Sequence, residues 1–222
     1  MRSPPACHDP ARLEAERLPA EALERSLDEA LAGRDPRAPL WIFAYGSLMW
    51  NPGLAFVAKR VGTIYGFHRS FCLWSRINRG TPERPGLVLT LERGGSCRGL
   101  AFRLTGSTSR DELRKLWQRE MSLGSYCPRW LEFHAGADRF PVLAFIVNRA
   151  CSGYTGKLPM ETIVQSIATA RGKYGSSAEY LFQTQAALES HGILDVRVKR
   201  LAERVKEHLA KGSGGPSGPT IA

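Results

Sequence analysis

Apolar residues follow different patterns in successive stretches of the chain. In residues 11–33, leucines recur among Glu, Arg and Ala, which predicts one or two short helices that end at Gly33. From residue 40 to about residue 104, short apolar runs alternate with Gly, Pro and Arg-Gly breaks, a pattern typical of short β-strands. These runs are LWIFAY, VGTIYGF, SFCLW, LVLTLE and RGLAFRL.

Helical spacing begins at residue 109. Ser109 can cap a helix, and Leu113, Leu116 and Trp117 fall on one face, so we expect a helix that ends near Met121. Two further strands are expected at RWLEF and RFPVLAFIV, and three helices follow them. The expected helices cover about 159–171, 176–191 and 194–210.

Together these elements predict an α+β fold: a small mixed, barrel-like β-sheet with an inserted helix and C-terminal helices. Strict βα alternation is absent, as are the glycine-rich dinucleotide and P-loop motifs, so a doubly wound nucleotide-binding fold is not expected. We expect an N-terminal helical extension and linker over 1–39, a single domain over 40–210, and a disordered Gly/Ser/Pro-rich tail over 211–222.

The 222-residue chain is basic, with 31 Lys and Arg against 21 Asp and Glu and a formal net charge of +10. This charge is compatible with nucleic acid, anionic lipid or an anionic small molecule as partner. The basic residues are dispersed, however, and the densest run, residues 197–211, has the spacing of an amphipathic helix with charges of both signs between its apolar positions. We therefore expect no nucleic-acid partner.

The sequence predicts no membrane span, disulfide framework or metal site. No apolar run approaches the roughly 20 residues that a span needs, and the N-terminus lacks the apolar core of a secretory signal, so we expect a cytoplasmic protein without a membrane partner. The five cysteines are odd in number and form no C-x-x-C pair, which indicates reduced thiols. The five histidines lack metal-ligand spacing.

Glu120 is the first candidate for chemistry. It follows Leu116 by four residues and Trp117 by three, so its carboxylate is expected on the apolar side of the helix. Burial disfavours the charged form and raises the pKa of a carboxylic acid, which suits a general acid/base. The alternative is a structural ion pair with Arg119 or another arginine.

The segment PLWIFAYGSLMWNPG contains a second candidate, because Gly46-Ser47 interrupts a strongly strand-forming run. A Gly-Ser turn at a strand end exposes backbone N–H groups that can bind an anionic or carbonyl oxygen. Ser47 does not fit a G-x-S-x-G nucleophile elbow, since Tyr45 and Met49 occupy the two glycine positions. A thiol nucleophile formed by Cys127 with a histidine such as His134 lacks an identified third group.

Four blocks in order, WIFAYGSLMWNPG, RGTPERPGLVLTLE, LWQREMSLGSY and SSAEYLF, together resemble the ChaC-like γ-glutamylcyclotransferases. The resemblance covers roughly residues 40–185 and leaves out the N-terminal helical segment and the Gly-rich tail. The turn after Glu120 is longer than the compact R-E-x-G-G-Y of eukaryotic members, and this longer form resembles the bacterial branch.

The resemblance implies that the chain cleaves glutathione by cyclising its γ-glutamyl group, which gives 5-oxoproline and cysteinylglycine without water, metal or cofactor. It implies Glu120 as the catalytic residue. A catalytically silent protein that binds γ-glutamyl compounds and a nucleic-acid-binding protein remain as alternatives, and the sequence does not give the oligomeric state. The substrate-binding residues that it implies are Ile42, Phe43, Ala44, Tyr45, Gly46, Ser47, Leu48, Arg79, Tyr126 and Tyr180.

Overall fold

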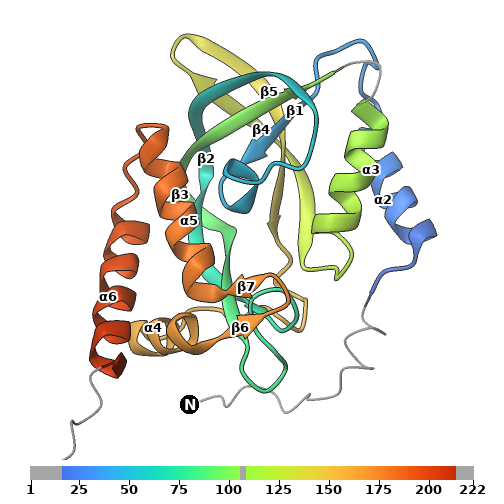
Figure 1. Ribbon diagram of the computed structural model, residues 1–222. Coiled ribbons are helices and arrows are strands. Elements are labelled where there is room, and N and C mark those ends of the chain that lie inside the picture. The colour runs from blue at the N-terminus through green and yellow to red at the C-terminus, as the bar shows by residue number, and fades with distance from the viewer. Residues whose placement is uncertain (1–16, 106–108, 214–222) are drawn as a thin grey trace, which may run out of the picture.

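The computed structural model describes residues 17–105 and 109–213 and has an α+β architecture, as the sequence predicts (Figure 1). Five strands form a closed barrel in the order β1-β3-β2-β4-β5. Neighbouring strands are antiparallel except β1 and β5, which close the barrel in parallel. The barrel strands are β1 (Trp41–Ala44), β2 (Phe56–Ser75), β3 (Gly86–Leu104), β4 (Tyr126–Ala135) and β5 (Asp138–Val147).

Two of these strands are much longer than expected, and the prediction of separate short strands is wrong here. VGTIYGF and SFCLW both lie within the 20 residues of β2, while LVLTLE and RGLAFRL lie within the 19 residues of β3. The glycines that suggested strand ends are bends instead: Gly66, Gly94 and Gly95 have φ of 84°, 97° and 74°. Because pairing continues past each bend with a shift in register, the strands curl around the barrel without ending.

The helices lie close to their expected positions. The chain has a single helix in the described part of its N-terminal extension, residues 17–39, and the expected helices after residue 105 are confirmed to within a few residues. The last helix continues to Ser213, so residues 211–213 of the expected tail are helical, while 1–16 and 214–222 lie outside the described residues. The helices are α2 (Ala20–Leu31), α3 (Ser109–Glu120), α4 (Met160–Thr169), α5 (Ser177–Ser190) and α6 (Val196–Ser213).

Helices cover the barrel from two sides (Figure 1). On one side α4, α5 and α6 pack on one another, and α5 also contacts β3 and the short 3-10 helix η1 (Ser47–Met49). On the other side α2 packs on α3. A two-stranded ribbon of β6 (Arg171–Gly172) and β7 (Gly175–Ser176) precedes α5, whose start is fixed by a capping box between Ser176 and Glu179.

The buried side chains form two clusters, one on each face of the sheet. Strand β1 contributes side chains to both clusters. Ile42 and Ala44 belong to the cluster that also contains helix residues, and Phe43 belongs to the cluster made mainly of strand residues. All three are fully buried. This alternation is the period-two pattern of a strand buried on both faces, and it fixes the position at which β1 ends.

Candidate active site

The segment after β1 is held in place by hydrogen bonds at both ends of a tight turn. Tyr45 Oη donates to the Phe145 carbonyl at 2.9 Å, and Arg69 Nε donates to the Tyr45 carbonyl at 2.7 Å. The first hydrogen bond of the turn runs from Met49 N–H to the Gly46 carbonyl at 2.9 Å. The N–H groups of Ser47 and Leu48 precede that bond and are not used by the turn.

Gly46 lies where helix α5 and strand β3 come closest to this turn. A Cβ atom at Gly46 would lie 3.0 Å from Tyr180 Oη and 3.7 Å from Leu89 Cβ. Tyr180 Oη in turn accepts a hydrogen bond from the Leu89 N–H at 3.3 Å. Glycine therefore allows the turn to approach both neighbours, a close contact that the strand-interrupting Gly46 predicted.

Glu120 is the last residue of α3, and its side chain lies against the same turn. Leu116 and Trp117 are buried one turn earlier, as the helical spacing predicts, and the Glu120 side chain is 15% exposed. Its Oε1 lies 3.0 Å from Arg119 Nε. The Glu120 carboxylate is therefore largely buried, and it forms the ion pair with Arg119 that the sequence offered as the alternative to a catalytic role.

Arg119 connects Glu120 to the turn. Its Nη2 donates to Ser47 Oγ at 2.9 Å, and its Nη1 donates to the Asn51 carbonyl at 2.7 Å. A guanidinium cannot take a proton from a hydroxyl, because its pKa is too high. The Arg119 guanidinium is therefore a hydrogen-bond donor to Ser47 Oγ and not a base that could activate the hydroxyl as a nucleophile.

A small cavity joins the residues from these elements. Seven of the site residues predicted from the sequence line this cavity. Leu89 and Phe145 also line it, and the sequence did not predict them. Its volume is about 20 Å³, which is room for about one water molecule. A γ-glutamyl group would therefore have to displace lining side chains outward as it enters. The expected residues that line the cavity are Tyr45, Gly46, Ser47, Leu48, Glu120, Tyr126 and Tyr180.

The surroundings of this cavity favour the protonated forms of its acids. Burial raises the pKa of Glu120, and the charge of Arg119 partly opposes that shift. Burial also raises the pKa of Tyr180 to about 12 and the pKa values of Tyr45 and Tyr126 well above their usual range, with the nearby Glu120 carboxylate adding to each. The three phenols are therefore neutral hydrogen-bonding groups around one titratable carboxylate.

Comparison with known proteins identifies the family of the chain. A model of the family described as ChaC-like protein matches residues 40–208. The chain belongs to this family. An *Escherichia coli* K12 protein named glutathione-specific γ-glutamylcyclotransferase is 39% identical over 193 residues, which covers 86% of this chain and 84% of that protein. The human glutathione-specific γ-glutamylcyclotransferase 1 is 36% identical over 154 residues, covering 67% and 69% of the two chains.

Among solved structures, the selenomethionine-labelled γ-glutamyl cyclotransferase specific to glutathione from yeast matches with a TM-score of 0.72. The match covers 78% of this chain and 97% of the yeast chain at 20% identity. At this identity the likeness supports the shared fold and no more. The barrel with helices on two sides is thus the fold of a solved cyclotransferase.

Four residues expected in the site of this ChaC-like chain do not line the cavity. Ile42, Phe43 and Ala44 lie in β1, with side chains fully buried in the core. Arg79 lies in the loop between β2 and β3, where its guanidinium carbon is 5.6 Å from the centre of the Tyr180 ring. Burial lowers the pKa of Arg79, and its charge is placed behind the tyrosine that faces the cavity.

The thiol hypothesis and a metal site find no support in the described residues. Cys127 and His134 lie near opposite ends of β4, where they pair with Ile146 and Arg139 of β5. Seven residues of strand separate them by roughly 23 Å, and an odd separation places them on opposite faces. Over residues 17–105 and 109–213, no group of three His, Cys, Asp or Glu side chains is arranged to hold a metal ion. No helix in the same ranges is long and apolar enough to cross a membrane.

Proposed function

We propose that this protein cleaves glutathione by cyclising its γ-glutamyl group, and that it releases 5-oxoproline and cysteinylglycine. The observation that carries the proposal is the placement of Glu120, a buried carboxylate with a raised pKa, against the turn formed by Gly46 and Ser47. The names of the *E. coli* and human relatives support glutathione as the substrate.

Cyclisation needs no external nucleophile. The α-nitrogen of the γ-glutamyl group attacks the γ-carbonyl carbon, a new C–N bond closes the five-membered ring, and the amide bond to the cysteine nitrogen breaks. The α-nitrogen begins as an ammonium and ends as a lactam N–H, so it loses two protons. The leaving nitrogen begins as an amide N–H and ends as an ammonium, so it gains two, and no water is consumed.

Glu120 moves these protons. As a carboxylate it accepts a proton from the α-ammonium, and as a carboxylic acid it donates that proton to the leaving nitrogen. The same exchange runs a second time as the tetrahedral intermediate collapses, when the ring nitrogen loses its second proton and the released amine becomes an ammonium. Its environment suits both steps, because burial raises the pKa of the acid while Arg119 keeps the carboxylate form accessible. Folding the γ-glutamyl chain back on itself supplies the proximity of the two reacting atoms, which contributes roughly 7–11 kcal/mol in favourable intramolecular reactions.

The turn after β1 binds the oxygen on which negative charge develops. The N–H groups of Ser47 and Leu48 are available to it, and donors fixed in this way stabilise a tetrahedral intermediate. The neutral hydroxyls of Tyr45, Tyr126 and Tyr180 bind the polar groups of the γ-glutamyl unit. Arg79 meets a substrate carboxylate after a movement past the Tyr180 ring.

The strand residues Ile42, Phe43 and Ala44 serve binding indirectly in this proposal. Their buried side chains hold β1, and so they fix where the turn begins. The cytoplasmic location expected from the sequence stays a prediction.

Incubation of the purified protein with glutathione tests the proposal. Mass spectrometry should find 5-oxoproline and cysteinylglycine in equal amounts, in buffer without added metal or cofactor. Glutamate in place of 5-oxoproline would show hydrolysis, and binding of glutathione without any product would favour a catalytically silent binding protein.

A further inference from the structure

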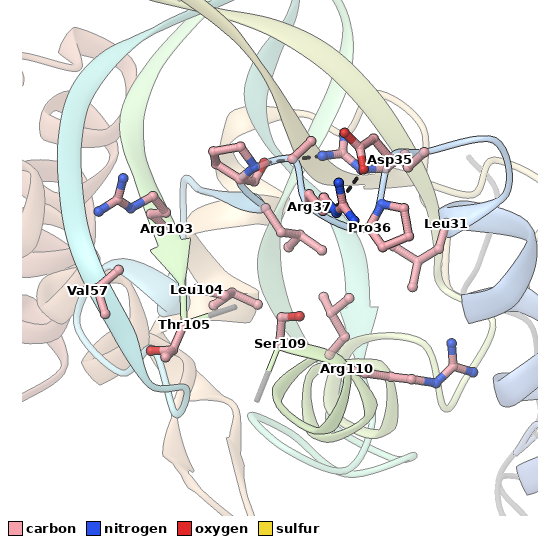
Figure 2. Close-up of a pocket in the computed structure, with 15 residues that line it drawn as sticks. Leu31, Asp35, Pro36, Arg37, Val57, Arg103, Leu104, Thr105, Ser109 and Arg110 are labelled. Carbon is pink, nitrogen blue, oxygen red and sulfur yellow. Dashed lines mark hydrogen bonds between the residues drawn. The ribbon is translucent and has the colours of Figure 1, made fainter. Parts of the chain in front are cut away.

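A second and larger cavity lies away from Glu120, between the N-terminal extension and the barrel (Figure 2). Its volume is about 530 Å³, within the roughly 300–1,000 Å³ of small-molecule sites. One wall is the linker of residues 34–39, which the sequence marked only as a connection. The other walls are the strand ends around Val57 and Arg103 and the first turns of α3.

The linker wall is a built structure with its own hydrogen bonds. Arg34 Nη2 donates to the Pro39 carbonyl at 3.2 Å, and the Arg37 N–H donates to Asp35 Oδ1 at 2.9 Å. The Arg34 guanidinium also stacks 3.9 Å from the centre of the Trp130 ring. Pro36 and Pro39 further restrict the backbone, so the wall is shaped before a ligand arrives.

The floor of this cavity is apolar. Leucines from the N-terminal extension, from β3 and from α3 line it, and a proline and a valine extend it toward the rim. An apolar ring or chain would be removed from water there, at about 25 cal/mol per Å² of apolar surface. The apolar lining residues are Leu31, Pro36, Ala38, Pro39, Leu40, Val57, Leu104 and Leu113.

The rim is positively charged and incompletely neutralised. Of the four arginines that line the cavity, Arg110 forms ion pairs with Glu24 and Asp28 of α2. Within the described residues, Arg34, Arg37 and Arg103 have no carboxylate within ion-pair distance. Asp35 is the single acidic residue in the lining. Guanidinium groups bind carboxylates, phosphates and sulfonates through paired N–H donors.

We infer that this cavity binds a small amphipathic anion, a molecule with an apolar ring or chain and one carboxylate, phosphate or sulfonate group. The apolar body lies on the leucine floor, and Arg37, on the linker wall, binds the anionic group at the rim. The Arg103 guanidinium is turned toward Trp41, with its central carbon 5.9 Å from the centre of that ring, and it adds positive charge near the rim without entering the cavity. The cavity also contacts the first half of α3, the helix that ends at Glu120. The inference goes beyond the proposed function, because it concerns binding at a separate site.

Titration with 1-anilinonaphthalene-8-sulfonate, an aromatic anion whose fluorescence rises on binding, tests the inference. The parent protein should bind one molecule per chain, and saturating glutathione should not displace it. The variant Arg37→Gln should bind the probe about tenfold more weakly, because a charge-assisted contact is lost. Arg93→Gln, which removes an exposed arginine of β3 outside the cavity, should bind like the parent.

N-phenyl-1-naphthylamine, which lacks the sulfonate, is the matched neutral probe. It should bind the parent and the Arg37 variant equally, which would show that the apolar floor is intact in the variant. The inference is overturned if the Arg37 variant keeps the parent's affinity for the sulfonate, if glutathione displaces the sulfonate probe, or if the parent does not bind it.

Discussion

At the scale of single residues, Arg119 has two contacts that bear on the chemistry. It forms an ion pair with Glu120 at 3.0 Å and donates a hydrogen bond to Ser47 Oγ at 2.9 Å. It thereby joins the proposed proton-transfer group to the turn that is proposed to bind the developing oxyanion. Two substitutions separate the chemical role of the carboxylate from the positioning role of the guanidinium.

Glu120→Gln keeps the size of the side chain and removes its capacity to accept a proton. We expect kcat for glutathione to fall by about 10²–10⁴-fold, while glutathione affinity and the thermal midpoint change little. Glu112→Gln is a matched control on the same helix, because Glu112 binds Lys115 and the Ala55 N–H and does not line the cavity. Parent-like turnover by the Glu120 variant would refute the proton-transfer role.

Arg119→Gln tests the electrostatic part of the same site through the pH profile. The charge of Arg119 lowers the pKa of Glu120, so its removal raises that pKa further. On acidification, Glu120 then becomes protonated at a higher pH and no longer acts as a base. The acid limb of the pH profile of kcat/KM should therefore shift to higher pH. Arg119→Lys keeps the charge and should leave the acid limb near that of the parent. An unmoved limb in the Gln variant would show that Arg119 does not influence the titration of Glu120.

At the scale of elements, the site is the junction of a strand end, a helix end and a second helix. The position of α3 was predictable, because its acidic first turn and its apolar spacing agree. The places of Leu89 and Phe145 in the cavity were not predictable, since they depend on which strands are neighbours in the barrel. The curling of β2 and β3 was also missed, because Gly66 and Gly94 resemble strand ends in a sequence.

Gly46→Val tests the turn itself. The added side chain meets Tyr180 Oη and Leu89, so the turn must shift away from α5 and β3. We expect KM for glutathione to rise by about tenfold or more, with a loss of only about 1 kcal/mol in the free energy of unfolding. Gly46→Ala should show a smaller change in the same direction. Equal glutathione affinity by calorimetry in the parent and the Val variant would contradict the close approach.

At the scale of the whole molecule, a buried arginine of the barrel forms an ion pair with the residue before helix α6. Arg69 of β2 is 6% exposed, donates to the carbonyls of Tyr45 and Arg98, and forms an ion pair with Asp195 before α6. Asp195 also accepts a hydrogen bond from the Val198 N–H at the start of that helix. This ion pair could not be predicted from the sequence, since Arg69 and Asp195 are 126 residues apart.

Asp195→Ala should therefore lower the free energy of unfolding by about 2 kcal/mol, through loss of the cap and exposure of an unpaired buried charge. Asp195→Asn keeps a capping oxygen and should cost less. Chemical denaturation measures both variants. Arg69 supports the Tyr45 carbonyl, so we also expect a modest fall in kcat/KM for the Ala variant. An unchanged free energy of unfolding in the Ala variant would contradict a stabilising role for the Arg69–Asp195 ion pair.

Glutathione acetylated on its α-amine tests the intramolecular attack most directly. The acetylated nitrogen is no longer an effective nucleophile, so the protein should release no cysteinylglycine from this substrate under conditions in which it converts glutathione fully. A hydrolase would attack the γ-carbonyl with its own nucleophile or with water and would still cleave the compound. Release of cysteinylglycine together with N-acetylglutamate would contradict cyclisation.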